Sequence, residues 1–137
     1  MWKTILAVLA AVVTAMVTFL VVEQIGTLLY PLPSGLNFED KAAVKQFMES
    51  RPWGAHAIVL LGWLLGSIEA GFIAQRISRQ ENATLPTIIG GILIASAALN
   101  FYLLPHPTWF IIEGILIFIS GVSVGWNVSR YIKQRGI

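Results

Sequence analysis

The sequence contains no cysteine and very little charge. Without cysteine the chain has no disulfides, no thiolate-ligated zinc or iron–sulfur cluster and no thiol nucleophile. Only 12% of its 137 residues are charged and 56% are hydrophobic, with a mean hydropathy of +0.75. A water-soluble domain of this composition would expose large apolar patches. We therefore expect lipid to surround most of the chain, which excludes a disordered tail and an ordinary soluble enzyme.

Basic residues are too scattered to form a nucleic-acid-binding surface. Nine Lys and Arg against seven Asp and Glu give a net charge of +2, and no basic run occurs. The sequence also has no phosphate-binding loop, dinucleotide fingerprint or nucleophile motif. We expect neither a nucleic-acid partner, nor a bound cofactor, nor an enzymatic activity.

Four long apolar blocks, separated by polar or proline-containing breaks, make up most of the chain. They cover residues 4–30, 53–75, 85–104 and 108–128, and each reaches the roughly 20 residues with which a helix crosses a bilayer. Their hydrophobicity is continuous rather than alternating, which excludes the strands of a barrel. The first block is longer than the ~7–15-residue core of a secretion signal, so we expect it to be a span. The sequence predicts one all-α domain over residues 1–137, an integral membrane four-helix bundle.

The distribution of basic residues predicts that both termini are cytoplasmic. Six basic residues lie on the side of the termini and three on the other side, and cytoplasmic loops carry the excess of Lys and Arg. The six are Lys3, Arg76, Arg79, Arg130, Lys133 and Arg135, and the three are Lys41, Lys45 and Arg51. In a bacterial inner membrane, the loop of residues 31–52 would then face the periplasm.

This outer loop is expected to contain a short amphipathic helix. Asn37 is the expected N-cap, with the two acidic residues at 39 and 40 in the first turn. Val44, Phe47 and Met48 would form the apolar side of the helix, which ends near Ser50. We favour a connector that lies on the outer membrane surface over a lid or a docking site.

Small residues recur at helical spacing in two of the blocks. The second block carries Gly62, Gly66 and Ala70, and the fourth carries Gly114, Gly121 and Gly125. Small residues let membrane helices approach closely, where lipid gives no hydrophobic drive to associate. We expect these residues to form seams within the bundle, and an interface of a homo-oligomer or a larger membrane complex remains the alternative.

Three glutamates, Glu23, Glu69 and Glu113, lie inside predicted spans. An ionised acid near the bilayer centre costs about 2.5 to 3.5 kcal/mol on insertion scales, so such residues usually face the bundle and pair or stay protonated. At a rise of 1.5 Å per residue, Glu69 lies about 10 Å from the inner boundary. On the fourth block Glu113, Ser120 and Asn127 form a heptad stripe, and Glu69 lies near its inner half. We favour a packing seam over the wall of a polar path for this stripe.

The other two glutamates are predicted to share a polar pocket in the outer leaflet. The same rise places Glu23, Glu113, Asn100 and His56 about 10, 9, 7 and 5 Å below the outer boundary. Gln24, Thr27 and His106 lie close enough in depth to join them. The pocket could hold a proton, a cation or a small polar head group, or be a hydrogen-bond network that only fastens helix ends. The ligand spacing is not diagnostic, so we expect no metal site.

Residues 22–33 (VEQIGTLLYPLP), 62–66 (GWLLG) and 105–110 (PHPTWF), together with Gly35, Asp40, Gly71, Ala74 and Asn100, resemble one known family. This is a family of small bacterial inner-membrane proteins without an assigned activity. The resemblance covers nearly the whole chain and implies a four-helix inner-membrane protein. Relatives often have a His where this chain has Thr27, and that difference weakens any metal site at Glu23.

Two classes of function remain open. The first is a non-enzymatic membrane component, either oligomeric or an accessory subunit, which the small-residue seams and the lack of a large soluble domain favour. The second is a small proton-linked transporter or permease, which the intramembrane glutamates favour. We favour the first.

Overall fold

The computed structural model describes residues 1–136, which form five helices and no strand. The helices are α1 (Trp2–Leu29), α2 (Lys41–Ser50), α3 (Trp53–Ser78), α4 (Thr84–Leu103) and α5 (Thr108–Gln134). Of these, α1, α3, α4 and α5 are long and apolar enough to cross a membrane. The predicted all-α class and the four candidate spans are therefore confirmed.

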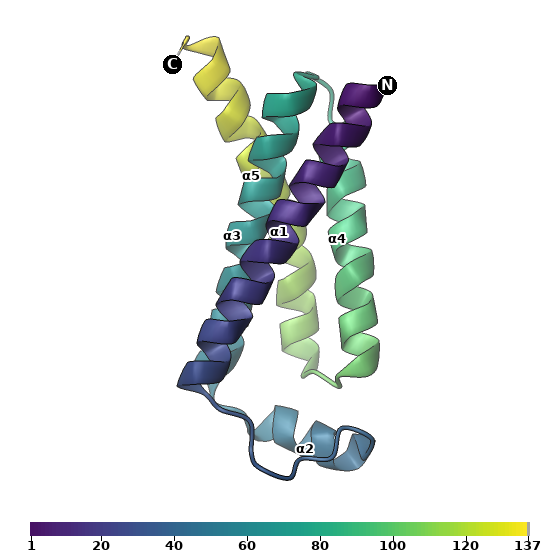
Figure 1. The fold of residues 1–137 in the computed structure, drawn as a ribbon, viewed down its shortest axis with the longest axis vertical. Helices are drawn as coiled ribbons and strands as arrows, with labels where there is room; N and C mark the ends of the chain where they lie inside the picture. The colour runs from purple at the N-terminus through teal and green to yellow at the C-terminus, as the bar shows by residue number, and fades with distance from the viewer. Residues whose placement is uncertain (137) are drawn as a thin grey trace.

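The four long helices run along the long axis of the molecule, and α1 crosses diagonally in front of α3 (Figure 1). Both chain termini lie at one end, which we call the terminus end, and α2 lies across the opposite end, which we call the α2 end (Figure 1). The central helix is α3, which packs against α1 and α5, while α4 packs mainly against α5. The lower half of α1 lies apart from α4 in this view, and residues of both helices line the cavities described below (Figure 1).

Two helices, α3 and α5, begin directly after a proline, and at the terminus end both extend beyond the predicted apolar blocks. Pro52 and Pro107 are the N-caps of α3 and α5, positions at which a missing N–H costs no helical hydrogen bond. The C-cap of α3 is Arg79 in the left-handed conformation, φ 56°, whose N–H donates to Gln75 O at 2.9 Å. Both α3 and α5 continue into polar residues beyond the predicted blocks, because hydropathy marks the apolar part of a helix and not its end.

The start of α2 corrects the sequence prediction. Asp40 is the N-cap, and its carboxylate accepts from the N–H groups of Ala42 at 3.0 Å and Ala43 at 3.1 Å. The expected cap, Asn37, instead accepts from the Glu39 N–H at 3.0 Å in a turn before the helix. Both Asn37 and Asp40 are suitable N-caps, and the helix begins after Asp40, whose side chain accepts from two backbone N–H groups. The apolar side is as expected at Val44 and Met48, which are buried.

The α1–α3 seam is built from small residues. Ala7, Ala11 and Ala15 recur every four residues on α1 and are fully buried. Opposite them on α3, a Cβ added at Gly62 would lie 2.8 Å from Val22 Cγ1, and one at Gly66 would lie 3.1 Å from Ala15 O. The two helices are therefore close enough to exclude larger side chains at these positions.

The α3–α5 seam is closer still, with backbone against backbone. A Cβ added at Gly121 would lie 2.6 Å from Ser67 Cβ, one at Gly125 would collide with the Ile68 carbonyl, and one at Gly71 would collide with the Val122 carbonyl. Ala70 is fully buried, and Gly114 lies under the Trp63 ring, 2.6 Å from Cζ3 to a hypothetical Cβ. All six predicted packing residues thus lie on faces turned towards a neighbouring helix.

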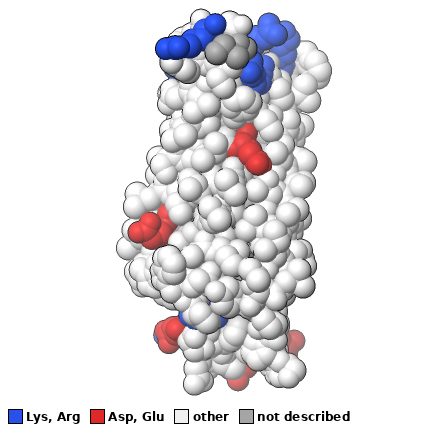
Figure 2. All heavy atoms as spheres, turned by 90° about the vertical axis from the view of Figure 1, so that its left-hand side faces the viewer, with Lys and Arg blue, Asp and Glu red and all other residues white. Residues whose placement is uncertain are grey.

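The outer surface of the bundle is mostly uncharged. Lys and Arg side chains gather at the terminus end, while acidic side chains interrupt an otherwise uncharged middle (Figure 2). The outward face of α1 exposes large apolar side chains from end to end: Ile5, Leu9, Val13, Val17 and Leu20 are each more than half exposed.

Candidate functional site

A cavity of about 250 Å³ lies at the α2 end, with walls from α1, α2, α3 and α4. Most of its wall is apolar, and the exceptions are Glu23, Thr27, Arg51, Asn100 and His106. Of the seven residues predicted for the polar pocket, the structure brings Glu23, Thr27, Asn100 and His106 to this cavity. The polar groups therefore come from α1, from α4, from the α2–α3 connection and from the α4–α5 connection.

Opposite charges from two segments meet in this wall. Glu23 projects from the last two turns of α1, and Arg51 lies between α2 and α3. Arg51 is half-buried, and its guanidinium lies 5.6 Å from the centroid of the Phe47 ring. Burial lowers the pKa of Arg51, and the Glu23 carboxylate opposes that shift. Among residues 1–136, neither side chain forms a salt bridge.

His106 lies in the short connection between α4 and α5. Its Nδ1 is 2.6 Å from the Leu104 carbonyl, so Nδ1 carries the proton and Nε2 of the neutral ring is left as an acceptor. The ring stacks on Phe110 at a centroid distance of 4.7 Å. Burial lowers the pKa of His106, and the nearby His56 and Arg51 act in the same direction, partly opposed by the Leu104 carbonyl.

His56 lies beside the cavity and not in its wall. It is buried, its Nε2 donates to the Met48 carbonyl at 3.2 Å, and its ring meets the edge of Trp109 at 5.4 Å. The bond to Met48 joins the end of α2 to the first turn of α3. The structure therefore places His56 where it holds α2 over the bundle.

Gln24 and Glu113 are exposed and lie outside the wall of the cavity. Glu113 precedes Gly114, which faces Trp63, and successive residues of a helix point about 100° apart. Its carboxylate is therefore turned away from the bundle. In the same way, Gln24 is rotated away from the face that presents Glu23.

The third glutamate, Glu69, is bonded within the α1–α3 seam. Its carboxylate accepts a hydrogen bond from the Thr18 hydroxyl at 2.5 Å. The side chain is half-buried and does not line the cavity. The structure thus keeps Glu69 apart from the polar groups at the α2 end.

A second, apolar cavity of about 230 Å³ adjoins the first along α1 and α4. Four residues, Phe19, Glu23, Trp63 and Asn100, line both cavities. Its remaining wall is formed by Met16, Leu20, Leu93, Ser96, Ala97 and Phe118. The two cavities together form a groove that is polar at the α2 end and apolar towards the middle of the bundle.

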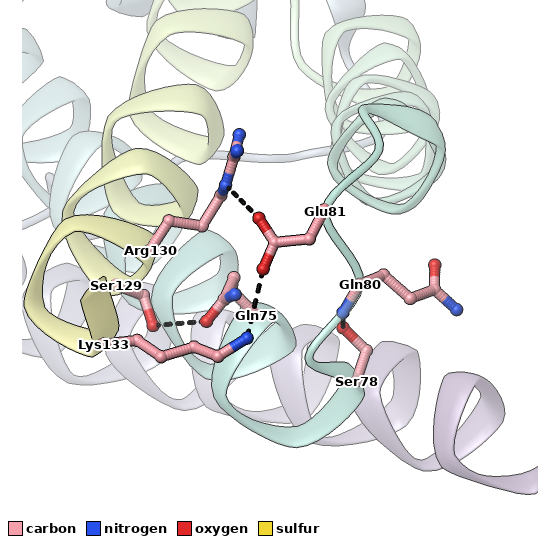
Figure 3. Close-up of polar contacts among 7 residues, drawn as sticks. All are labelled: Gln75, Ser78, Gln80, Glu81, Ser129, Arg130 and Lys133. Atoms are coloured by element: carbon pink, nitrogen blue, oxygen red, sulfur yellow. Dashed lines mark hydrogen bonds and ion pairs between the residues drawn. The ribbon is translucent and has the colours of Figure 1, made fainter. Parts of the chain in front are cut away.

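A separate polar cluster joins α3, the α3–α4 connection and α5 at the terminus end (Figure 3). Glu81 accepts from Arg130 and Lys133, each at 3.1 Å, and Ser129 donates to Gln75 Oε1 at 3.0 Å. The bond from Lys133, followed by the charges of Lys133 and Arg130, lowers the pKa of Glu81. Gln75 Nε2 is buried and has no hydrogen-bond partner among the described residues. This cluster fastens helix ends, and sequence reasoning did not find it.

Arg51 is the cavity residue that sequence reasoning missed. It was counted only as a charge of the outer loop, although it directly precedes the Pro52-Trp53 start of a span and so lies at the depth of the pocket. Its position next to the start of a span was the signal in the sequence that could have identified it.

As for metals, residues 1–136 contain no group of three or more His, Cys, Asp or Glu side chains that could hold an ion.

No protein-family model, curated protein or solved structure matches this chain. The contacts, burial and charges described above are therefore what bears on its function.

Proposed function

We propose that the chain is a small multi-pass protein of a bacterial inner membrane with both termini in the cytoplasm. Three observations support this: four helices of spanning length, the exposed apolar face of α1, and the basic side chains at the terminus end (Figure 2). The proposal includes membership of the family of bacterial four-helix inner-membrane proteins that residues 22–33, 62–66 and 105–110 resemble.

Within that membrane, the proposed role is a non-enzymatic oligomeric or accessory component that associates through α5. One observation carries this role, the outward position of Glu113. Ser120 and Asn127 follow it at seven-residue steps, and all three are exposed. Ser120 donates to Leu116 O at 2.7 Å and Asn127 donates to Ser123 O at 2.8 Å. Glu113 has no side-chain hydrogen bond among the described residues.

An ionised acid facing lipid is unfavourable by up to about 2.5 to 3.5 kcal/mol, the cost at the bilayer centre. Association of two copies about a twofold axis along α5 would remove this cost, because each Glu113 would face its equivalent and the two carboxyls could share a proton. Ser120 and Asn127 would continue the same contact along the helix. A second copy therefore satisfies the polar stripe without any further residue.

Cysteine cross-linking in membranes tests this role, and the absence of native cysteine makes it direct. We expect Ser120→Cys on α5 to form a disulfide-linked dimer on oxidation. Val13→Cys, which is also exposed but lies on the apolar face of α1, is the matched control and should remain monomeric. Cross-linking of Ser120→Cys to a different protein would assign the accessory role instead. A monomer at both positions, with no partner retained on purification, would overturn the proposal.

A small proton-linked transporter is the second candidate, and the Glu23 carboxylate in the cavity wall favours it. Proton or solute flux into liposomes would be compared for the native chain, Glu23→Gln and Glu69→Gln. Transport predicts flux that the Glu23 substitution abolishes. If the native chain gives no flux above empty liposomes, this candidate is removed.

A further inference from the structure

We propose that the groove between α1 and α4 binds one phospholipid with a zwitterionic head group that carries a primary ammonium, the chemistry of phosphatidylethanolamine. The cavity at the α2 end would hold the head group, and the adjoining apolar cavity would hold an acyl chain.

The head-group assignment rests on the two opposite charges in one wall. Arg51 offers a planar guanidinium, which suits the oxygens of a phosphate, and Asn100 on the facing helix adds an amide N–H. Glu23 offers a carboxylate, which suits an ammonium. A head group that is itself a phosphate joined to an ammonium through a short linker complements both charges at once.

The lack of polar protein partners for Arg51, Glu23 and Asn100 among residues 1–136 supports the binding of a ligand between them. Arg51 and Glu23 influence each other electrostatically but form no salt bridge among the described residues, and the Asn100 side chain makes no hydrogen bond there. Their surroundings include Phe38, Phe47 and Met48, which offer no polar partner. Of the two charges, Arg51 is half-buried and Glu23 is exposed. The half-buried guanidinium in an apolar wall needs a polar partner to offset its desolvation.

The lipid assignment rests on the change of polarity along the groove. The second cavity shares Glu23 and Asn100 with the first at one end and is otherwise lined by apolar side chains and Ser96. A soluble phosphate compound would leave that apolar length unfilled. A lipid, with a polar head and an apolar chain in the same order, matches both parts.

The inference rests on the membrane location proposed above but not on association through α5, whose polar stripe lies outside both cavities. A chain that inserts into membranes and forms dimers could therefore still fail the following test. Such a result would overturn the lipid site and leave the proposed function in place.

Native mass spectrometry of the full chain in detergent measures the retention of added lipids. The probes are phosphatidylethanolamine, phosphatidylglycerol and phosphatidylcholine with identical acyl chains. We expect phosphatidylethanolamine to be retained about tenfold more than either of the others, the effect of one charge-assisted hydrogen bond. Phosphatidylglycerol lacks the ammonium, and phosphatidylcholine has one that cannot donate. Equal retention of the three lipids by the native chain would overturn the proposal.

Two substitutions separate the two charges. Arg51→Gln should lower the retention of all three lipids by about tenfold, because each carries the phosphate. Glu23→Gln should remove only the preference for phosphatidylethanolamine over the other two lipids. The matched controls, Arg79→Gln and Glu49→Gln, change exposed residues outside the groove and should behave like the native chain. Circular dichroism in the same detergent verifies that each variant is folded.

A final pair of measurements distinguishes a lipid from a soluble head group. Phosphoethanolamine alone should compete only weakly, and Ser96→Leu, which fills the apolar cavity, should lower lipid retention. Phosphoethanolamine that competes as well as the lipid, or Ser96→Leu with native retention, would overturn the acyl-chain part of the proposal. Unchanged retention in Arg51→Gln would overturn the head-group part even if the native chain prefers phosphatidylethanolamine.

Discussion

Replacing Gly125 with alanine should separate α3 from α5. The added Cβ would collide with the Ile68 carbonyl oxygen and lie 2.7 Å from its carbon and 2.9 Å from Phe72 N. These are backbone atoms of a central helix, so no rotamer change can relieve the contact. The helices must move apart, and the neighbouring contact of Gly71 with Val122 loosens with them. Overpacking of this kind costs about 1–3 kcal/mol.

The matched control is Gly91→Ala on α4, where a Cβ would meet no atom within 4 Å. There alanine should stabilise the helix by up to about 0.5–1 kcal/mol through its higher propensity. The two variants therefore differ in the sign of the change in the free energy of unfolding. Unfolding by sodium dodecyl sulfate in mixed micelles, followed by circular dichroism, measures both. A Gly125→Ala protein as stable as Gly91→Ala would refute the close approach of α3 and α5.

Three further predictions concern polar contacts. In a double-mutant cycle of Thr18→Val and Glu69→Gln, the coupling free energy should be about 0.6 kcal/mol and at most about 1.7 kcal/mol, the range for membrane hydrogen bonds; additive effects would contradict the bond. Ser129→Ala should cost about 1–3 kcal/mol because it leaves the buried Gln75 oxygen without a donor. Ser123→Ala, whose hydroxyl donates only to its own helix at Ile119 O, should change stability by less than about 0.5 kcal/mol, and equal effects would show that the Gln75 contact does not matter. Finally, burial lowers the pKa of His106 in the folded chain. The pKa of a histidine in the unfolded chain is about 6.5, so the unfolded chain binds more protons at this position than the folded chain. Stability should therefore fall as the pH drops below about 6.5 and level off below the folded pKa, and His106→Asn should weaken this dependence in thermal unfolding from pH 8 to pH 4; an identical pH profile in the two proteins would refute it.

The long helices could be predicted because each is marked by a continuous apolar run between prolines or polar residues. The side of α2 that packs was equally visible, since Val44 and Met48 are four residues apart and both are buried. The cap of α2 was not, because Asn37 and Asp40 are both good N-caps and only the turn geometry decides between them.

The polar pocket was predicted by depth alone, which is half of the information needed. Residue rise gives the height of Glu113 and Glu23 along their helices, but the rotation of each helix about its axis decides which way a side chain points. The position of Gly114 indicates part of the rotation of α5, because Gly114 packs against Trp63 and the preceding residue, Glu113, then points outward. The position of Arg51 depends on how the chain enters α3 after α2, which no periodicity of the spans encodes.

In the proposed membrane location, the unequal lengths of the helices would make the molecule respond to bilayer thickness. The 28 residues of α1 and the 20 residues of α4 extend about 42 Å and 30 Å, against a hydrocarbon layer of about 30 Å. In such a layer α4 fits upright, whereas α1 matches only when it leans, as its diagonal course in Figure 1 allows. Thinning of the bilayer would increase that lean and widen the wedge between α1 and α4, and thickening would narrow it. In the membrane location proposed above, the mismatch of these two helices would couple the mechanical state of the bilayer to the width of the groove.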